Sequence, residues 1–146
     1  MLRLLDESSE VRRVSQVPAG EQLRRLVTIF YHRCERRELC LNGALSPDYY
    51  TFTPSMQEMV KQMCAANLDW AGECLEKGRS EGQMHFEGTA ADRAMLLMST
   101  LLSSLLLSRV LTAEIFARTL DRLLQDMGID WKIADLPPAE GPNNIN

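Results

Sequence analysis

The stretch ADRAMLLMSTLLSSLLLSRV, residues 91–110, decides the fold, because it has no charged side chain between Arg93 and Arg109. A helix that spans a membrane needs about 20 predominantly apolar residues. The uncharged run covers only residues 94–108 and includes four serines and one threonine. Runs of this length are more often buried helices. We therefore expect a covered helix in a protein that does not enter a membrane.

Leucine and methionine occupy every side of this expected helix, at positions 95–98, 101, 102 and 105–107. A surface helix normally keeps a charged face, so this helix must be covered on nearly all sides. A chain of 146 residues has little material with which to enclose one helix completely. A second copy of the chain is the natural cover, because obligate dimer interfaces resemble a domain core cut in half. The alternative is a central helix inside a monomeric bundle.

A last helix is expected from Thr112 to Gly128, and the very short turn before it makes the two helices neighbours. Two such hairpins, related by a two-fold axis, would close an intermolecular four-helix interface. Small side chains at four-residue steps would let the helices approach closely. The residues predicted for this interface are Leu97, Thr100, Leu101, Ser104, Leu105, Ser108, Phe116, Leu120 and Leu123.

Two earlier helices are visible in the apolar pattern. Apolar residues recur at three- and four-residue steps from Leu23 onward, which predicts a helix over about 20–38. Thr53 suits the cap of another helix, which we expect over about 53–77. Gly78 and Gly82 are candidate stops for that helix.

The domain organisation follows from these elements. We expect a partly helical or loose segment at 1–17, one helical domain at 18–128 and a mostly irregular tail at 129–146, loose from residue 134 onward. A short helical piece is expected within 42–50, between two turns. Because no strand pattern appears, the sequence predicts an all-α bundle of about five helices.

Composition and charge limit the function. The net charge of −4 argues against a general phosphate-binding surface. No secretory signal opens the chain, and the four cysteines form no C-x-x-C pair, so we expect reduced thiols in a cytoplasmic protein.

Catalysis and metal binding have little support in the sequence. The two histidines, His32 and His85, belong to no acid–base constellation, and scattered cysteines lack zinc spacing. We therefore expect no enzyme activity, no catalytic residues, no metal and no cofactor. A thiol sensor that uses Cys34 and Cys40 stays open as an alternative, because three arginines lie nearby.

Three motifs together carry a resemblance to a known family. RRELCLNGAL (36–45) resembles an Arg-Gly-Cys-Leu-type segment, and WAGECLEKGRSEGQM (70–84) resembles a Trp-led helix end with its closing glycines. The stretch 91–109 resembles an interface helix, in which Ser103 replaces the usual glycine and Ser108 replaces an alanine. Over about residues 20–128 the chain resembles the C-terminal ligand-binding and dimerisation domain of the TetR/AcrR family of bacterial transcriptional regulators, many of them repressors.

The resemblance implies a homodimer that senses a small effector. It places the effector among the helices 20–38, 53–77 and the start of 89–110, and methionine suits a hydrophobic or aromatic molecule because it repacks around varied shapes. The predicted ligand-binding residues are Phe30, Tyr31, Phe52, Met56, Met59, Met63, Trp70 and Met95. The alternative is that this stripe is solid core.

Family members also carry an N-terminal DNA-binding head with a helix-turn-helix. The residues before Pro18 show no such motif, so we expect no direct DNA binding by this chain. Three hypotheses remain: an effector-sensing dimeric regulatory domain, a headless interaction module that heterodimerises with a full-length regulator, and a small enzyme.

Overall fold

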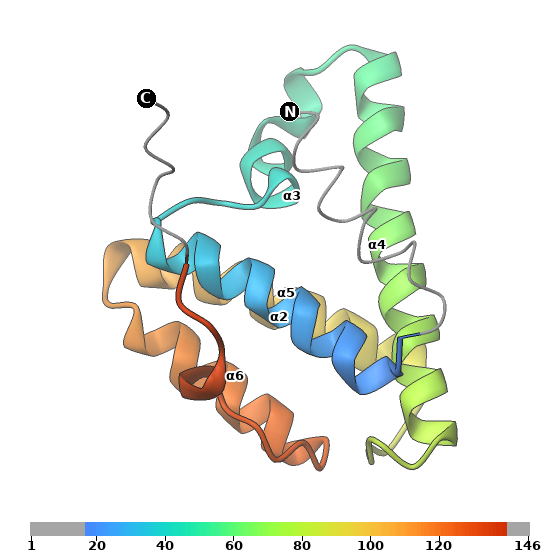
Figure 1. Cartoon of the computed structure of the whole chain (residues 1–146). Helices are drawn as coiled ribbons and strands as arrows, with labels where there is room; N and C mark the ends of the chain where they lie inside the picture. Colours follow the sequence, from blue (N-terminus) through green and yellow to red (C-terminus); the bar gives the residue numbers. More distant parts are fainter. Residues whose placement is uncertain (1–16, 140–146) are drawn as a thin grey trace, which may run out of the picture.

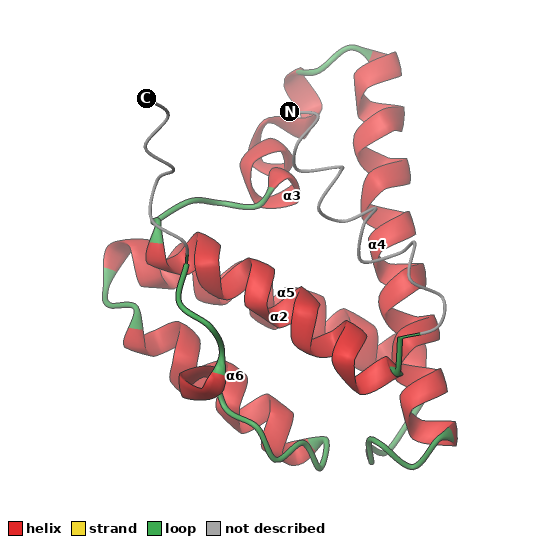
Figure 2. Cartoon of the chain, viewed as in Figure 1, coloured by secondary structure: helices red, strands yellow, loops and turns green. Residues whose placement is uncertain are grey.

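The computed structural model describes residues 17–139, and this part of the chain contains helices and no strand (Figure 2). The expectations for residues 1–16 lie outside the described residues. The all-α fold of about five helices is confirmed. The elements are α2 (Ala19–Glu35), α3 (Leu41–Leu45), the 3-10 helix η1 (Ser46–Thr51), α4 (Pro54–Ser80), α5 (Ala90–Val110), α6 (Glu114–Asp126) and the 3-10 helix η2 (Ile133–Asp135).

Helix α5 forms the centre of the packing, because it contacts α2, α4 and α6 (Figure 1). Its buried side chains recur at three- and four-residue steps, and they face the other helices: Ala94, Leu97, Met98, Leu101, Ser104 and Leu105. Helix α6 adds the buried face of Phe116, Leu120 and Leu124. The helix that the uncharged run predicts is thus present, and one side of it forms the core of the single chain.

Helix α2 ends three residues earlier than the predicted Glu38. Arg37 adopts a positive φ of 56°, which a continuing right-handed helix does not allow. The chain turns there, and the N–H of Glu38 donates to the carbonyl oxygen of Arg33 at 2.9 Å. This turn directs the chain into α3.

Helix α4 continues through Gly78 to Ser80, so of the two candidate stops Gly78 is wrong and Gly82 is confirmed. Gly78 is buried, and Met84 lies against it with its Sδ atom 2.7 Å from the place that a Cβ atom would occupy. The chain leaves the helix only at Gly82, which has a φ of 73°. Gly78 therefore serves packing between the helix and the following loop.

The first half of α4 extends beyond the layer formed by α2, α5 and α6 (Figure 1). Between Pro54 and Trp70, Val60 is the one buried residue. Contacts with α3 and η1 support this half of the helix, whereas Ala71, Cys74 and Leu75 anchor the other half in the core. The protruding half of α4 (54–70) is consequently less enclosed than the rest of the fold.

The tail is packed as far as the structure describes it, which differs from the loose tail that the sequence predicts. Helix α6 ends at Asp126, and Gly128, with a φ of 71°, turns the chain out of the helix, as the sequence predicts. Residues 129–139 then run back over α6 and α2, and Ile133 and Leu136 are buried. The segment is mostly irregular, but its apolar residues pack at irregular spacing that no periodic pattern could indicate.

Helix α5 is long and apolar enough to cross a membrane by length and composition alone. The uncharged run is shorter than this helix, which has 21 residues. Of its most apolar window, 39% is buried inside the structure.

Candidate functional site

Helix α5 has two different apolar sides. One side is the core face described above, and the opposite side is open to solvent. The open side carries two small residues near its middle, Ser99 and Ser103, and large apolar residues toward both ends: Met95, Leu96, Leu106, Leu107 and Val110, followed by Leu111. We call these eight residues the open α5 face. A large exposed apolar patch on a small domain marks a surface that meets another molecule.

The predicted interface residues mostly lie on the other side of the helix. Leu97, Leu101 and Leu105 are completely or almost completely buried, as are Phe116 and Leu120 of α6. A side chain that is buried in the single chain has no surface left for a second one. These residues therefore form the intramolecular core, and the homodimer itself stays a prediction.

The small polar residues among those predicted for the dimer interface are also buried or half-buried. Ser104 is only 2% exposed, while Thr100, Ser108 and Leu123 are partly buried. The hydroxyl of Thr100 donates to the carbonyl of Leu96 at 2.7 Å, and the hydroxyl of Ser108 donates to that of Ser104 at 2.6 Å. Asp92 stands on the same side as Ser99 and Ser103 at helical spacing, but the buried Ser104 shows that small polar residues alone do not mark the open side in the sequence.

The solvent-exposed side of α6 is charged. Arg118 pairs with Glu114 at 3.8 Å, and Arg122 pairs with Asp126 at 3.1 Å, all with exposed side chains. Each pair spans one turn of the helix. Because the opposite face of α6, with Phe116 and Leu120, packs into the core, this charged side faces solvent.

Three of the predicted effector residues belong to the core. Phe30 is buried, and Trp70 packs against the buried cluster. Tyr31 stacks on Phe116 with ring centroids 6.4 Å apart. These positions support the alternative of solid core for this part of the stripe.

The other predicted effector residues do not share one environment. Phe52, at the end of η1, is half-buried, as are Met56 and Met63 in the protruding half of α4. Met59 is 62% exposed on the same half, and Met95 is 49% exposed on the open α5 face. The structure thus leaves Phe52, Met56 and Met63 as the apolar residues that remain partly accessible around the protruding half.

Sequence reasoning missed Asn42, a buried polar residue in the first turn of α3. Its Oδ1 atom is buried and has no hydrogen-bond partner within residues 17–139. Buried amide oxygens nearly always find a partner, so an unpaired one requires an explanation. The Asn42-Gly43 pair predicts only a turn. The burial of the Asn42 side chain depends on packing that the sequence does not reveal.

The surroundings of Cys34 and Cys40 favour the protonated thiol. Burial raises the pKa of Cys34, partly offset by a hydrogen bond with Ser108, and burial also raises the pKa of Cys40. The Cys40 Sγ atom accepts from the N–H of Gly43 at 3.4 Å and caps α3. A thiol sensor needs a readily formed thiolate, so these environments argue against that alternative.

Metal-ligating side chains do not gather in groups of three or more across the part of the chain that the structure describes.

Comparisons with known proteins give no relative. No family model matches the chain, and no curated protein or solved structure shows a significant match to it. Fold and comparisons together support an all-helical domain of about five helices, with the family not identified.

Proposed function

We propose that this chain is the effector-sensing and dimerisation domain of a TetR-like transcriptional regulator. The observation that carries the proposal is the open α5 face, an exposed apolar surface on the helix that the family resemblance assigns to the dimer interface. The family in this proposal comes from the resemblance. The partner is proposed because the apolar surface of the open α5 face is exposed in the single chain.

The pattern of the open α5 face fits a second copy of the same chain. The small residues Ser99 and Ser103 lie near its middle, so two helices that cross there can approach closely. In an antiparallel crossing, the Met95–Leu96 end of one copy meets the Leu106–Leu107 end of the other. A two-fold axis makes both halves of such a contact equivalent.

The proposed effector site lies where the protruding half of α4 approaches α3. Phe52, Met56 and Met63 offer partly accessible apolar surface there. The Oδ1 atom of Asn42 in α3 is buried and unpaired, so it becomes available as an acceptor only when a bound molecule displaces the residues that cover it. An apolar or aromatic molecule with one hydrogen-bond donor matches this combination.

Binding would act on the helices that enclose this region. An effector changes the balance between two arrangements only by its different affinity for them. Because the protruding half of α4 is weakly enclosed while its other half is anchored against α5, a molecule bound there favours one tilt of α4 over another.

The molar mass in solution tests the dimer. Multi-angle light scattering of the wild type is expected to give twice the 16.5 kDa chain mass. Ser103→Arg places a bulky charge at the middle of the open α5 face and is expected to give the single-chain mass. Ala65→Arg, the control, makes a small-to-cationic change on the exposed side of α4 and is expected to keep the dimer.

Thermal-shift screening tests the effector. Hydrophobic and aromatic compounds with one hydrogen-bond donor are expected to raise the melting temperature, and Met56→Glu is expected to abolish that shift. If the chain dimerises but no compound in a broad library stabilises it, the interaction module becomes the better description.

A further inference from the structure

Residues 129–139, which we call the C-terminal strap, lie across α6 and α2 (Figure 1). Ile133 and Leu136 anchor the strap in the core, and Ile129 and Trp131 pack against the same cluster. Apart from the three-residue η2, the strap has no regular secondary structure. It is therefore held by its anchors and by contacts from neighbouring helices.

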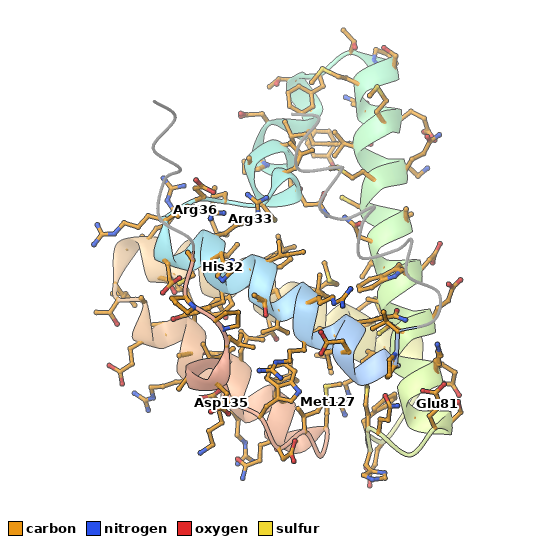
Figure 3. The ribbon with its side chains drawn as sticks, in the orientation of Figure 1. His32, Arg33, Arg36, Glu81, Met127 and Asp135 are labelled. Atoms are coloured by element: carbon orange, nitrogen blue, oxygen red, sulfur yellow. The ribbon has the colours of Figure 1, made fainter. Side chains whose placement is uncertain are left out.

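Side chains of α2 and α6 hold the backbone of the strap. The Asp121 carboxylate accepts from the N–H of Ile133 at 2.7 Å. Arg24 donates to the carbonyl of Asp135 at 3.1 Å, and His32 donates through Nε2 to the carbonyl of Pro137 at 2.8 Å. Figure 3 labels His32 on α2 and Asp135 on the strap. These contacts recognise main-chain groups, as in a bound peptide.

The last contact is shared with an aromatic residue. The Glu35 carboxylate accepts from the N–H of Ala139 at 2.9 Å. The same carboxylate hydrogen-bonds to the hydroxyl of Tyr31, and this bond is the largest cause of the raised pKa of Tyr31. Tyr31 also stacks on Phe116 of α6. Glu35 thus connects the strap to the face of α2 that carries Tyr31.

We infer that the C-terminal strap is a releasable clasp over α2, and that Glu35 couples its docking to the position of Tyr31. The clasp is a regulatory device of the fold. Its connection to an effector rests on the proposed function, whereas the coupling between Tyr31, Glu35 and the strap is a property of the chain alone.

The strap is suited to release without unfolding the rest. Three of its four polar contacts with α2 and α6, those of Arg24, His32 and Glu35, are exposed to solvent. It joins α6 through Gly128, whose left-handed backbone already breaks the helix. Segments with few buried anchors and exposed hydrogen bonds open at lower free energy than the global fold.

The tryptic cleavage rate at Lys132–Ile133 measures release in the full chain. While the strap is docked, the N–H of Ile133 is bound to Asp121 and the Ile133 side chain is buried, so a protease reaches this bond only in the open state. When opening and closing are fast, the cleavage rate follows the population of the open state. The rate is measured as the accumulation of the released C-terminal fragment, which is identified by its mass.

Ala139→Pro removes the N–H that donates to Glu35 and is expected to raise the cleavage rate about fivefold, the effect of one exposed hydrogen bond. Ala139→Ser keeps the N–H and is expected to leave the rate within about twofold. Tyr31→Phe removes the hydroxyl that positions Glu35. It is expected to raise the rate in the wild-type background but not in the Ala139→Pro background.

Two outcomes would overturn the inference. An unchanged rate in Ala139→Pro means that Glu35 does not hold the strap. An equal increase from Tyr31→Phe in both backgrounds means that the two contacts act independently. Both measurements use the unliganded chain, so a failed effector screen leaves them unaffected, and a failed coupling leaves the dimer test unaffected.

Discussion

Ser103 and Ser104 are neighbours in α5 and occupy opposite environments, because Ser103 is exposed on the open α5 face and Ser104 is 2% exposed in the core. The same substitution at the two positions therefore separates assembly from folding.

Ser104→Arg is expected to lower the free energy of unfolding by at least about 3 kcal/mol, because it forces a charge into the core without a partner. Ser103→Arg is expected to change it by less than about 0.5 kcal/mol per chain, apart from the loss of assembly. Chemical denaturation followed by circular dichroism measures both. Similar losses at the two positions would contradict the assignment of faces.

Two glycines of α4 are expected to respond to alanine with opposite signs. At Gly72 the nearest atom to a new Cβ is 3.9 Å away, so Gly72→Ala should stabilise the helix by about 0.5–1 kcal/mol. At Gly78 a Cβ would lie 3.0 Å or less from three atoms of the fully buried Met84, so Gly78→Ala should cost about 1–2 kcal/mol. Thermal unfolding of both variants checks the prediction, and a gain at Gly78 would refute the close packing.

The cap of α5 is expected to contribute to stability. The Thr89 hydroxyl oxygen accepts from the N–H of Asp92 at 3.1 Å. Thr89→Ala should lower the free energy of unfolding by about 1 kcal/mol, and Thr89→Ser should keep most of it because serine retains the acceptor. Equal stability of the two variants would show that the hydroxyl contributes nothing.

The environment of Cys74 predicts that the folded state loses stability at alkaline pH. Burial raises its pKa from 9.0 to about 11, and its thiol donates to the carbonyl of Ala19 at 3.5 Å. Below pH 9 the thiol is protonated in both states. Between pH 9 and about 11 it ionises only in the unfolded chain, so the folded state loses stability there as pH rises.

Cys74→Ala lacks this ionisation and provides the comparison. The difference in unfolding free energy between wild type and Cys74→Ala is expected to shrink by about 1–2 kcal/mol from pH 8 to pH 10.5. Denaturant titrations at the two pH values measure it. A constant difference would mean that the Cys74 environment does not disfavour the thiolate.

The helices could be predicted from the sequence because their signals are local. Thr53 and Thr89 cap the helices that were expected after them, with side chains that accept from Met56 and Asp92. Gly128 ends α6 for the same kind of reason. The sequence could not separate Gly78 from Gly82 as the stop of α4, since a buried glycine that makes room for Met84 and a glycine that ends a helix look identical in sequence.

The site was less predictable because it depends on which side of a helix faces inward. Helix α5 is apolar around its whole circumference, so periodicity could not distinguish Leu105 in the core from Leu106 on the open α5 face. Packing against α2, α4 and α6 determines which side of α5 is buried. The unpaired Asn42 and the strap anchors Ile133 and Leu136 likewise depend on contacts between segments distant in the sequence.

The protruding half of α4 gives the molecule a lever. Its 17 residues, 54–70, extend about 25 Å at the rise of an α-helix, so a tilt of about 5° at the anchored base moves the tip by about 2 Å. A small rearrangement around Ala71 and Leu75 therefore produces a larger displacement at Pro54 and at the adjoining η1.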